Sequence, residues 1–166
     1  MHSALVCQLL LLLYHQATTF FDLFPFNGAR NYTRQERWAE MGTNAVLMGL
    51  APIGFLFDIH ALQVYGTYYY FVLFAIELTI WWIPYFCTPH GMWRRAYNVA
   101  LALGTSNFGS ADALSDWLTT HRRIHAGTWS LLPPKARRIV PNLEHTLLHA
   151  WTLVTAVVTS AAVHGQ

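Results

Sequence analysis

Four long and largely apolar stretches dominate this chain, and they cover residues 4–24, 41–59, 64–86 and 143–163. A helix needs about 20 mostly apolar residues to cross the hydrocarbon core of a bilayer. Charged residues make up only 11% of the 166 residues, less than half the share in a typical soluble domain. A soluble protein of this size could not cover its surface with so few charged side chains. We therefore predict one all-α domain, an integral membrane protein built as a four-transmembrane-helix bundle.

The first apolar stretch also resembles the core of a signal peptide at residues 5–13. It lacks a basic lead and a small-x-small cleavage site, and its apolar run continues to Phe24. We therefore expect this stretch to be kept as the first span.

The basic residues predict the orientation of these spans. All ten Lys and Arg residues lie within residues 30–37 and 94–138. Basic side chains collect in cytoplasmic loops because they are costly to translocate. We predict that loops 25–40 and 87–142 are cytoplasmic and that both termini lie on the opposite side. These basic loops favour contact with anionic membrane lipids over nucleic acid, because no basic face is interleaved with stacking aromatic residues.

The long second loop contains a segment with helical periodicity, residues 111–125. Its apolar and charged side chains fall on opposite faces, which predicts an amphipathic helix on the cytoplasmic interface between spans three and four. The apolar face comprises Leu114, Trp117, Leu118 and Ile124, and the charged face comprises Asp112, Asp116, Arg122 and Arg123. His121 and His125 share this cationic segment, which would repel a divalent cation, so we interpret them as part of an interfacial basic helix.

Several ionisable residues lie inside the predicted spans, where they are costly and therefore candidates for function. They are His15 in span one, Glu77 in span three, and Glu144, His145 and His149 in span four. At about 1.5 Å per residue, His15 and Glu77 lie about 14 Å from the cytoplasmic ends of their spans, and His149 lies about 10 Å from its own. Side chains from three helices therefore fall at similar depth, which predicts a shared polar pocket in the cytoplasmic half of the bilayer.

Three further side chains belong to this predicted pocket. Asp22 lies near the rim of span one, Asn44 enters span two at a compatible level, and Trp81 is one of the aromatic residues of span three. We expect all three to contact a bound ligand or cofactor. A structural alternative is that the polar residues only hydrogen-bond one another and hold the helices in register, at about 0.6 kcal/mol per contact.

A metal ion is one candidate occupant of the pocket. His145 and His149 are four residues apart, so both imidazoles lie on one helical face and can chelate a metal. With His15 and Glu77 they offer three nitrogens and one carboxylate, a donor set for iron, zinc or copper. A b-type haem held by His15 and His149 is a variant of this prediction. The His-x3-His spacing is similar to the histidine boxes of membrane desaturases and hydroxylases, but no His-x-x-His-His accompanies it, so that activity is not carried over.

A lipophilic small molecule is the other candidate occupant. A Glu in a pocket of low dielectric, beside histidines that titrate near neutrality, can move a proton, so we expect Glu77, His149 and His15 to be catalytic residues acting on a lipid-like substrate. Trp81 and other aromatic residues would suit a sterol-, isoprenoid- or quinone-like molecule. A third alternative is a non-catalytic subunit of a larger complex, bound to partner membrane subunits.

Fragments of the chain resemble the EXPERA family of sterol isomerases and ligand-binding membrane proteins. These fragments are His15 with Asp22 in span one and Glu77-Leu78 followed by Pro84. The size of the chain and its buried carboxylate are similar as well. The order of the spans relative to the glutamate differs from the family pattern, so no residue role is carried over from it.

Overall fold

The computed structural model describes residues 2–87, 94–95, 97–99, 113–135 and 138–165, and this part of the chain is helical without a named strand. Four helices are long and apolar enough to cross a membrane: α1 (His2–Phe20), α2 (Arg34–Leu56), the continuous helix His60–Phe86 and α7 (Leu143–His164). The predicted all-helical fold with four long apolar helices is therefore confirmed.

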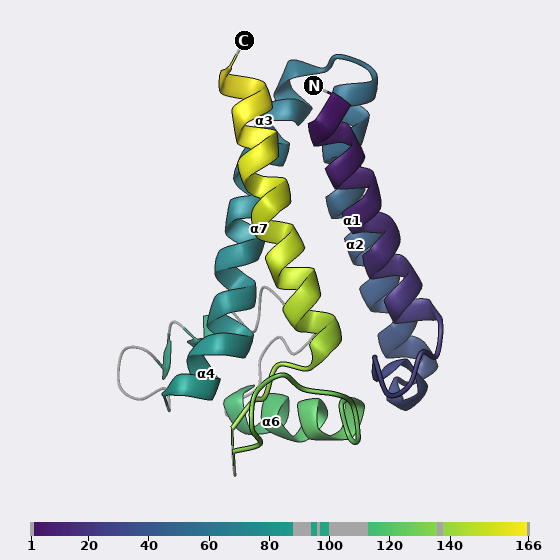
Figure 1. The fold of residues 1–166 in the computed structure, drawn as a ribbon, viewed down its shortest axis with the longest axis vertical. Coiled ribbons are helices and arrows are strands. Elements are labelled where there is room, and N and C mark those ends of the chain that lie inside the picture. Colours follow the sequence, from purple (N-terminus) through teal and green to yellow (C-terminus); the bar gives the residue numbers. More distant parts are fainter. Residues whose placement is uncertain (1, 88–93, 96, 100–112, 136–137, 166) are drawn as a thin grey trace.

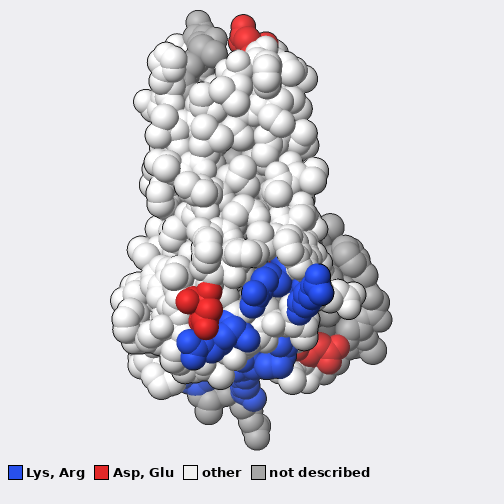
Figure 2. All heavy atoms as spheres, turned by 90° about the vertical axis from the view of Figure 1, so that its right-hand side faces the viewer, with Lys and Arg blue, Asp and Glu red and all other residues white. Residues whose placement is uncertain are grey.

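The four long helices pack as a closed ring. The helix His60–Phe86 consists of α3 (His60–Glu77), η2 (Leu78–Trp82) and α4 (Ile83–Phe86). Both α1 and α3 contact α2 on one side and α7 on the other. The two termini lie at one end of the bundle, and α6 (Ala113–Ile124) lies across the opposite end (Figure 1). On the face shown in Figure 2, Lys and Arg side chains gather at the α6 end, and the long shaft above them is uncharged up to an acidic side chain at its far end.

Helix α1 ends four residues before the predicted boundary at Phe24, and the buried side chain of Asn27 supplies the reason. Its amide nitrogen donates to the carbonyl oxygens of Thr18, at 2.6 Å, and Phe21, at 2.9 Å. Its Oδ1 accepts from the Leu23 N–H at 3.0 Å. These bonds satisfy carbonyls that the helix leaves without partners at its C-terminus, so the chain turns away there.

Helix α2 begins at Arg34, seven residues before the predicted span. A capping box starts it: Thr33 Oγ1 accepts from the Glu36 N–H at 3.2 Å, and Glu36 Oε2 accepts from the Thr33 N–H at 2.8 Å. This exchange satisfies two backbone donors at the helix start. The polar first turns are therefore helical, and Glu40 belongs to the same helix as the apolar residues that follow.

A π-helical turn, η2, follows directly after Glu77. A π-turn closes its hydrogen bonds over five residues instead of four, and such turns are frequent at functional sites. The wider turn brings both Trp81 and Trp82 against α7. The Trp81 ring stacks on His145 with ring centroids 4.0 Å apart, and Trp82 Nε1 donates to His149 Nδ1 at 2.9 Å.

A helix is present where the periodicity of residues 111–125 predicts one, although residues 111–112 lie outside the described part of the chain. Trp117, His121 and Ile124 of α6 are buried, whereas Arg122 and Arg123 are exposed. Arg123 forms an ion pair with Glu36, and Asn31 Nδ2 donates to the Ile124 carbonyl at 2.8 Å. These contacts hold α6 against the start of α2; its location at a membrane interface stays a prediction.

The contact between Gly28 and α6 gives a prediction for stability. A Cβ at position 28 would overlap the backbone carbonyl of Ile124, which cannot move without displacing α6. We expect Gly28→Ala to lower the free energy of unfolding by about 1–3 kcal/mol, the usual cost of overpacking. The measurement is the thermal unfolding midpoint in detergent. Gly42→Ala is the matched control, because nothing lies within 4 Å of a Cβ there. An unfolding midpoint that falls equally for both variants would contradict this account.

Candidate functional site

A cavity of about 380 Å³ lies between the pair α1 and α2 and the pair formed by the α3–η2 segment and α7. Apolar side chains of α2, α3 and α7 form part of its wall, among them Met48, Leu73 and Leu148. Trp117 and Ile124 of α6 line the end that faces away from the termini. The cavity therefore has an apolar interior and is covered at one end by α6.

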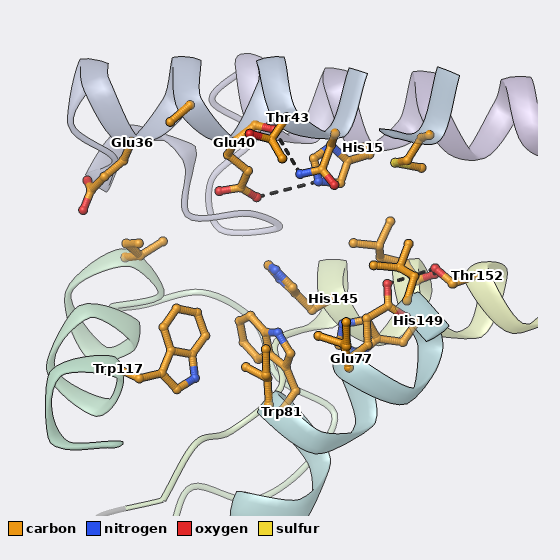
Figure 3. Close-up of a pocket in the computed structure, with 18 of the residues that line it drawn as sticks. His15, Glu36, Glu40, Thr43, Glu77, Trp81, Trp117, His145, His149 and Thr152 are labelled. Atoms are coloured by element: carbon orange, nitrogen blue, oxygen red, sulfur yellow. Dashed lines mark hydrogen bonds and ion pairs between the residues drawn. The ribbon is translucent and has the colours of Figure 1, made fainter. Parts of the chain in front are cut away.

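The polar residues predicted from depth along the spans line this cavity. The six that do so are His15, Asn44, Glu77, Trp81, His145 and His149. In Figure 3 His15 projects from one wall, while Glu77, His145 and His149 project from the other, so the cavity separates two groups of polar side chains. The structure therefore brings these residues together around one cavity.

Asp22 does not line the cavity. It is exposed beyond the end of α1, and its carboxylate forms an ion pair with Arg30 at 3.0 Å. The hydrogen bond from the Arg30 side chain lowers the pKa of Asp22 below its ordinary value. This exposed pair contributes little to stability because water screens it.

Glu40 is the main polar residue of the cavity that the sequence analysis missed. Its Oε1 lies 3.7 Å from His15 Nε2, and both side chains line the cavity (Figure 3). Hydropathy predicts that span two begins at Met41, so Glu40 becomes the last residue of the preceding loop. The capping box at Thr33 and Glu36 was the sequence signal that could have extended the helix to include Glu40.

Three buried polar atoms of cavity-lining residues have no hydrogen-bond partner in the described part of the chain: Glu77 Oε2, His15 Nδ1 and Trp117 Nε1. Glu77 Oε1 accepts from Thr152 Oγ1 at 3.0 Å, but Glu77 Oε2 has no donor. His15 Nδ1 also lacks a partner, and the two residues are only 8% and 7% exposed. An unpaired buried polar atom costs about 1–3 kcal/mol, so such atoms call for a specific explanation. The atoms of Glu77 and His15 point to a ligand-binding role for the cavity.

The contact with Trp82 fixes the tautomer of His149. The indole Nε1–H can only donate, so His149 Nδ1 accepts at 2.9 Å and the imidazole proton lies on Nε2. His149 is therefore neutral, with an Nε2–H that can donate to a ligand in the cavity. A metal or haem iron could bind this ring only if the bond to Trp82 or the Nε2 proton were lost.

A second group of polar rings surrounds Trp81 on the side of α6; we call His121, His125 and His145 the imidazole cluster. The ring centroids of His121 and His125 lie 5.0 and 5.2 Å from that of Trp81. Burial, with the neighbouring His145 as a smaller cause, lowers the pKa of His121 to about 3 and that of His125 well below its ordinary value. Both imidazoles, that of His121 in α6 and that of His125 directly after it, are therefore uncharged at neutral pH.

The sequence interpretation placed these two histidines on a cationic surface, and the structure corrects it. The rings of His121 and His125 face Trp81, whereas Arg122 and Arg123 are exposed. The signal was present in the spacing, because Trp117, His121 and His125 are four residues apart and share one helical face. The basic residues beside them in the sequence hid this face.

Two members of the imidazole cluster, together with Glu144, have the composition of a metal site. His125, Glu144 and His145 offer ligand atoms that all lie within 4.8 Å of one another. The group shares only His145 with the metal ligands expected from the sequence; His15, Glu77 and His149 lie outside it. The donor set of His15, Glu77, His145 and His149 remains a prediction.

Comparisons of the chain with models of known protein families, with curated proteins and with solved structures find no match.

The bond between Trp82 and His149 gives a second prediction. Trp82→Phe removes the indole donor and leaves His149 Nδ1 buried without a partner, so we expect a loss of about 1–3 kcal/mol in the free energy of unfolding. Denaturation in detergent measures it. Trp38→Phe, at a tryptophan that is 54% exposed, is the matched control and should change little.

A double variant tests whether the two residues act as a pair. When Trp82→Phe is combined with His149→Leu, no unpaired acceptor remains, so the double variant should lose less than the sum of the single losses. Strictly additive losses would show that the hydrogen bond does not couple these residues.

Proposed function

We propose that this chain is a multi-pass membrane protein whose cavity binds a small lipophilic molecule with a polar end. Its four long helices expose large apolar side chains outward, as Leu13, Val46, Val72 and Val157 illustrate, each more than half exposed. Contiguous exposed apolar surface of this kind indicates a membrane or a partner. The basic residues sit at the α6 end, so the positive-inside rule supports a cytoplasmic location for that end.

The observation that carries the ligand proposal is the pair of unpartnered atoms, Glu77 Oε2 and His15 Nδ1, in the cavity wall. A ligand hydroxyl, amine or carbonyl can satisfy atoms of this kind, whereas a hydrocarbon chain cannot. The apolar walls suit the remainder of a lipid-like molecule. A volume of about 380 Å³ lies within the range of small-molecule sites, about 300–1,000 Å³.

The same residues can perform acid–base chemistry on such a ligand. Glu77 lies on one wall, and the pair of His15 and Glu40 lies on the opposite wall (Figure 3). A molecule between them would meet a carboxyl group on one side and an imidazole on the other, so one group could give a proton while the other takes one. His149 Nε2–H would orient the polar end of the molecule from the side of Glu77.

The ligand proposal predicts the behaviour of Glu77→Gln. We expect the wild-type protein, extracted from membranes with mild detergent, to carry a lipophilic compound that untargeted mass spectrometry finds in its organic extract. Glu77→Gln should reduce the bound amount at least tenfold, because the amide cannot supply a carboxylate to the ligand. Asp58→Asn makes the same chemical change at an exposed carboxylate and should retain the compound.

Two outcomes would contradict the ligand proposal. One is a wild-type extract with no compound beyond those in an extract of an unrelated four-span protein. The other is equal retention by the wild type, Glu77→Gln and Asp58→Asn, with all three eluting as folded protein from size-exclusion chromatography.

The membrane orientation gives a separate prediction. Cys7 and Cys87 are first replaced by serine. Two variants of this protein then each carry one new cysteine at an exposed position: Gln35→Cys at the basic end and His60→Cys at the opposite end. We expect a membrane-impermeant maleimide to label position 60 in intact cells and position 35 only after permeabilisation. The reverse pattern would invert the proposed orientation, and labelling of both in intact cells would argue against spanning helices.

A further inference from the structure

We propose that His125, Glu144 and His145 bind a divalent transition-metal ion of the zinc type where α6 meets the start of α7. This site is separate from the ligand proposal, since only His145 also lines the cavity. It also differs from the donor set expected from the sequence, which placed the metal deeper in the bundle. Two nitrogens and one carboxylate oxygen form a set that zinc accepts, with a fourth position left for another ligand.

The spacing of the donor atoms supports this site. Zinc bonds to nitrogen and oxygen are about 2.0–2.2 Å long, so two ligand atoms of a tetrahedral site lie roughly 3.4 Å apart. His145 Nδ1 and Glu144 Oε2 are already 3.4 Å apart, and all three candidate atoms lie within 4.8 Å of one another. Small side-chain rotations at His125 would therefore complete the triad without moving either helix.

The contacts of Asn142 indicate that the lone pairs of His125 Nδ1 and Glu144 Oε2 are directed toward the same point. The amide nitrogen of Asn142 lies 3.2 Å from His125 Nδ1 and 3.4 Å from Glu144 Oε2, so both acceptors face one electropositive group. Asn142 Oδ1 accepts the His145 backbone N–H at 3.0 Å as the N-cap of α7, and this bond fixes which way the amide points. A cation between His125 and Glu144 would replace the amide N–H bonds and leave the cap intact.

His145 can join the same ion by a change of tautomer. Its Nδ1 lies 2.8 Å from Asn142 Oδ1, an acceptor, so the proton is on Nδ1 in this structure. Metal binding through Nδ1 requires that proton to leave, to Nε2 or to solvent, which frees the Nδ1 lone pair for the metal. Glu144 supplies the negative charge, which offsets the positive end of the α7 dipole.

His121 supplies a second, independent observation. The residue is 5% exposed, its Nε2 has no hydrogen-bond partner among the described residues, and its ring centroid lies 4.8 Å from that of His125. The unpaired lone pair costs free energy unless a ligand uses it. His121 is thus a candidate for the fourth metal position, one helical turn before His125. Arg122 and Arg123 are exposed, so water and salt partly screen their charges from the site.

The test is a titration of the purified protein with Co²⁺ alone. The protein carries an affinity tag without histidine and is first stripped with EDTA. Equilibrium dialysis with elemental analysis gives the stoichiometry, and the visible absorption of Co²⁺ reports a tetrahedral site. We expect about one Co²⁺ per chain with strong visible bands, and competition by Zn²⁺.

Two variants remove ligands in different ways. Glu144→Gln keeps the shape of the side chain and one accepting oxygen, so it should fold while losing at least tenfold in affinity; His125→Ala should lose a similar amount. His60→Ala is the control, because it removes an exposed histidine at the opposite end of the bundle and should bind Co²⁺ as the wild type does. Far-ultraviolet circular dichroism checks the helix content of each variant.

Three outcomes would overturn the site. No Co²⁺ uptake by folded wild-type protein would show that Asn142 and the histidines form a purely structural network. Uptake kept by His125→Ala and Glu144→Gln would show an adventitious ion on surface histidines only. Loss of uptake in a third variant, His149→Ala, but not in His125→Ala would move the metal to the cavity.

Discussion

In a bundle whose helices carry almost no charge, each buried polar side chain needs a partner on a neighbouring helix, and α7 supplies several of them. Gln8 on α1 donates to Thr159 at 2.9 Å, and Glu77 at the end of α3 accepts from Thr152 at 3.0 Å. Trp82 of η2 donates to His149. Apolar surroundings cannot replace these bonds, so they fix the rotation of α7 relative to α1 and α3. That rotation directs His145 and His149 toward the cavity.

Three local features of the chain then place the remaining site residues. Asn27 ends α1 early and turns the chain back toward α6, the capping box at Thr33 extends α2 far enough to include Glu40, and the π-turn η2 brings two tryptophans against α7. Asn27 and the capping box lie outside the four apolar stretches, whereas η2 lies within the third. The long helices form the bundle, and these local features decide which side chains line the cavity.

The same distinction between long helices and local features explains which site residues could be predicted from the sequence. Depth along a helix depends only on the rise per residue, so the convergence of His15, Glu77 and His149 could be predicted from three separate spans. Glu40 could not be placed in this way, because a hydropathy window excludes charged residues at its edge. His121 and His125 were assigned to a cationic surface, because adjacency in sequence to arginines says nothing about the face on which a side chain lies. The partner of each ring, and therefore its tautomer, required coordinates.

The cavity and the imidazole cluster are not independent, because Trp81 and His145 belong to both. Trp81 lines the cavity with one part of its surface and contacts His121 and His125 with another. A molecule that presses on Trp81 acts on the rings that pack α6 against the bundle, and a change at those rings alters the cavity wall in turn. Linkage of this kind is reciprocal. Any change that a metal at His125 and His145 makes in the affinity for a lipophilic ligand would therefore be matched by an equal change in the affinity for the metal when the ligand binds.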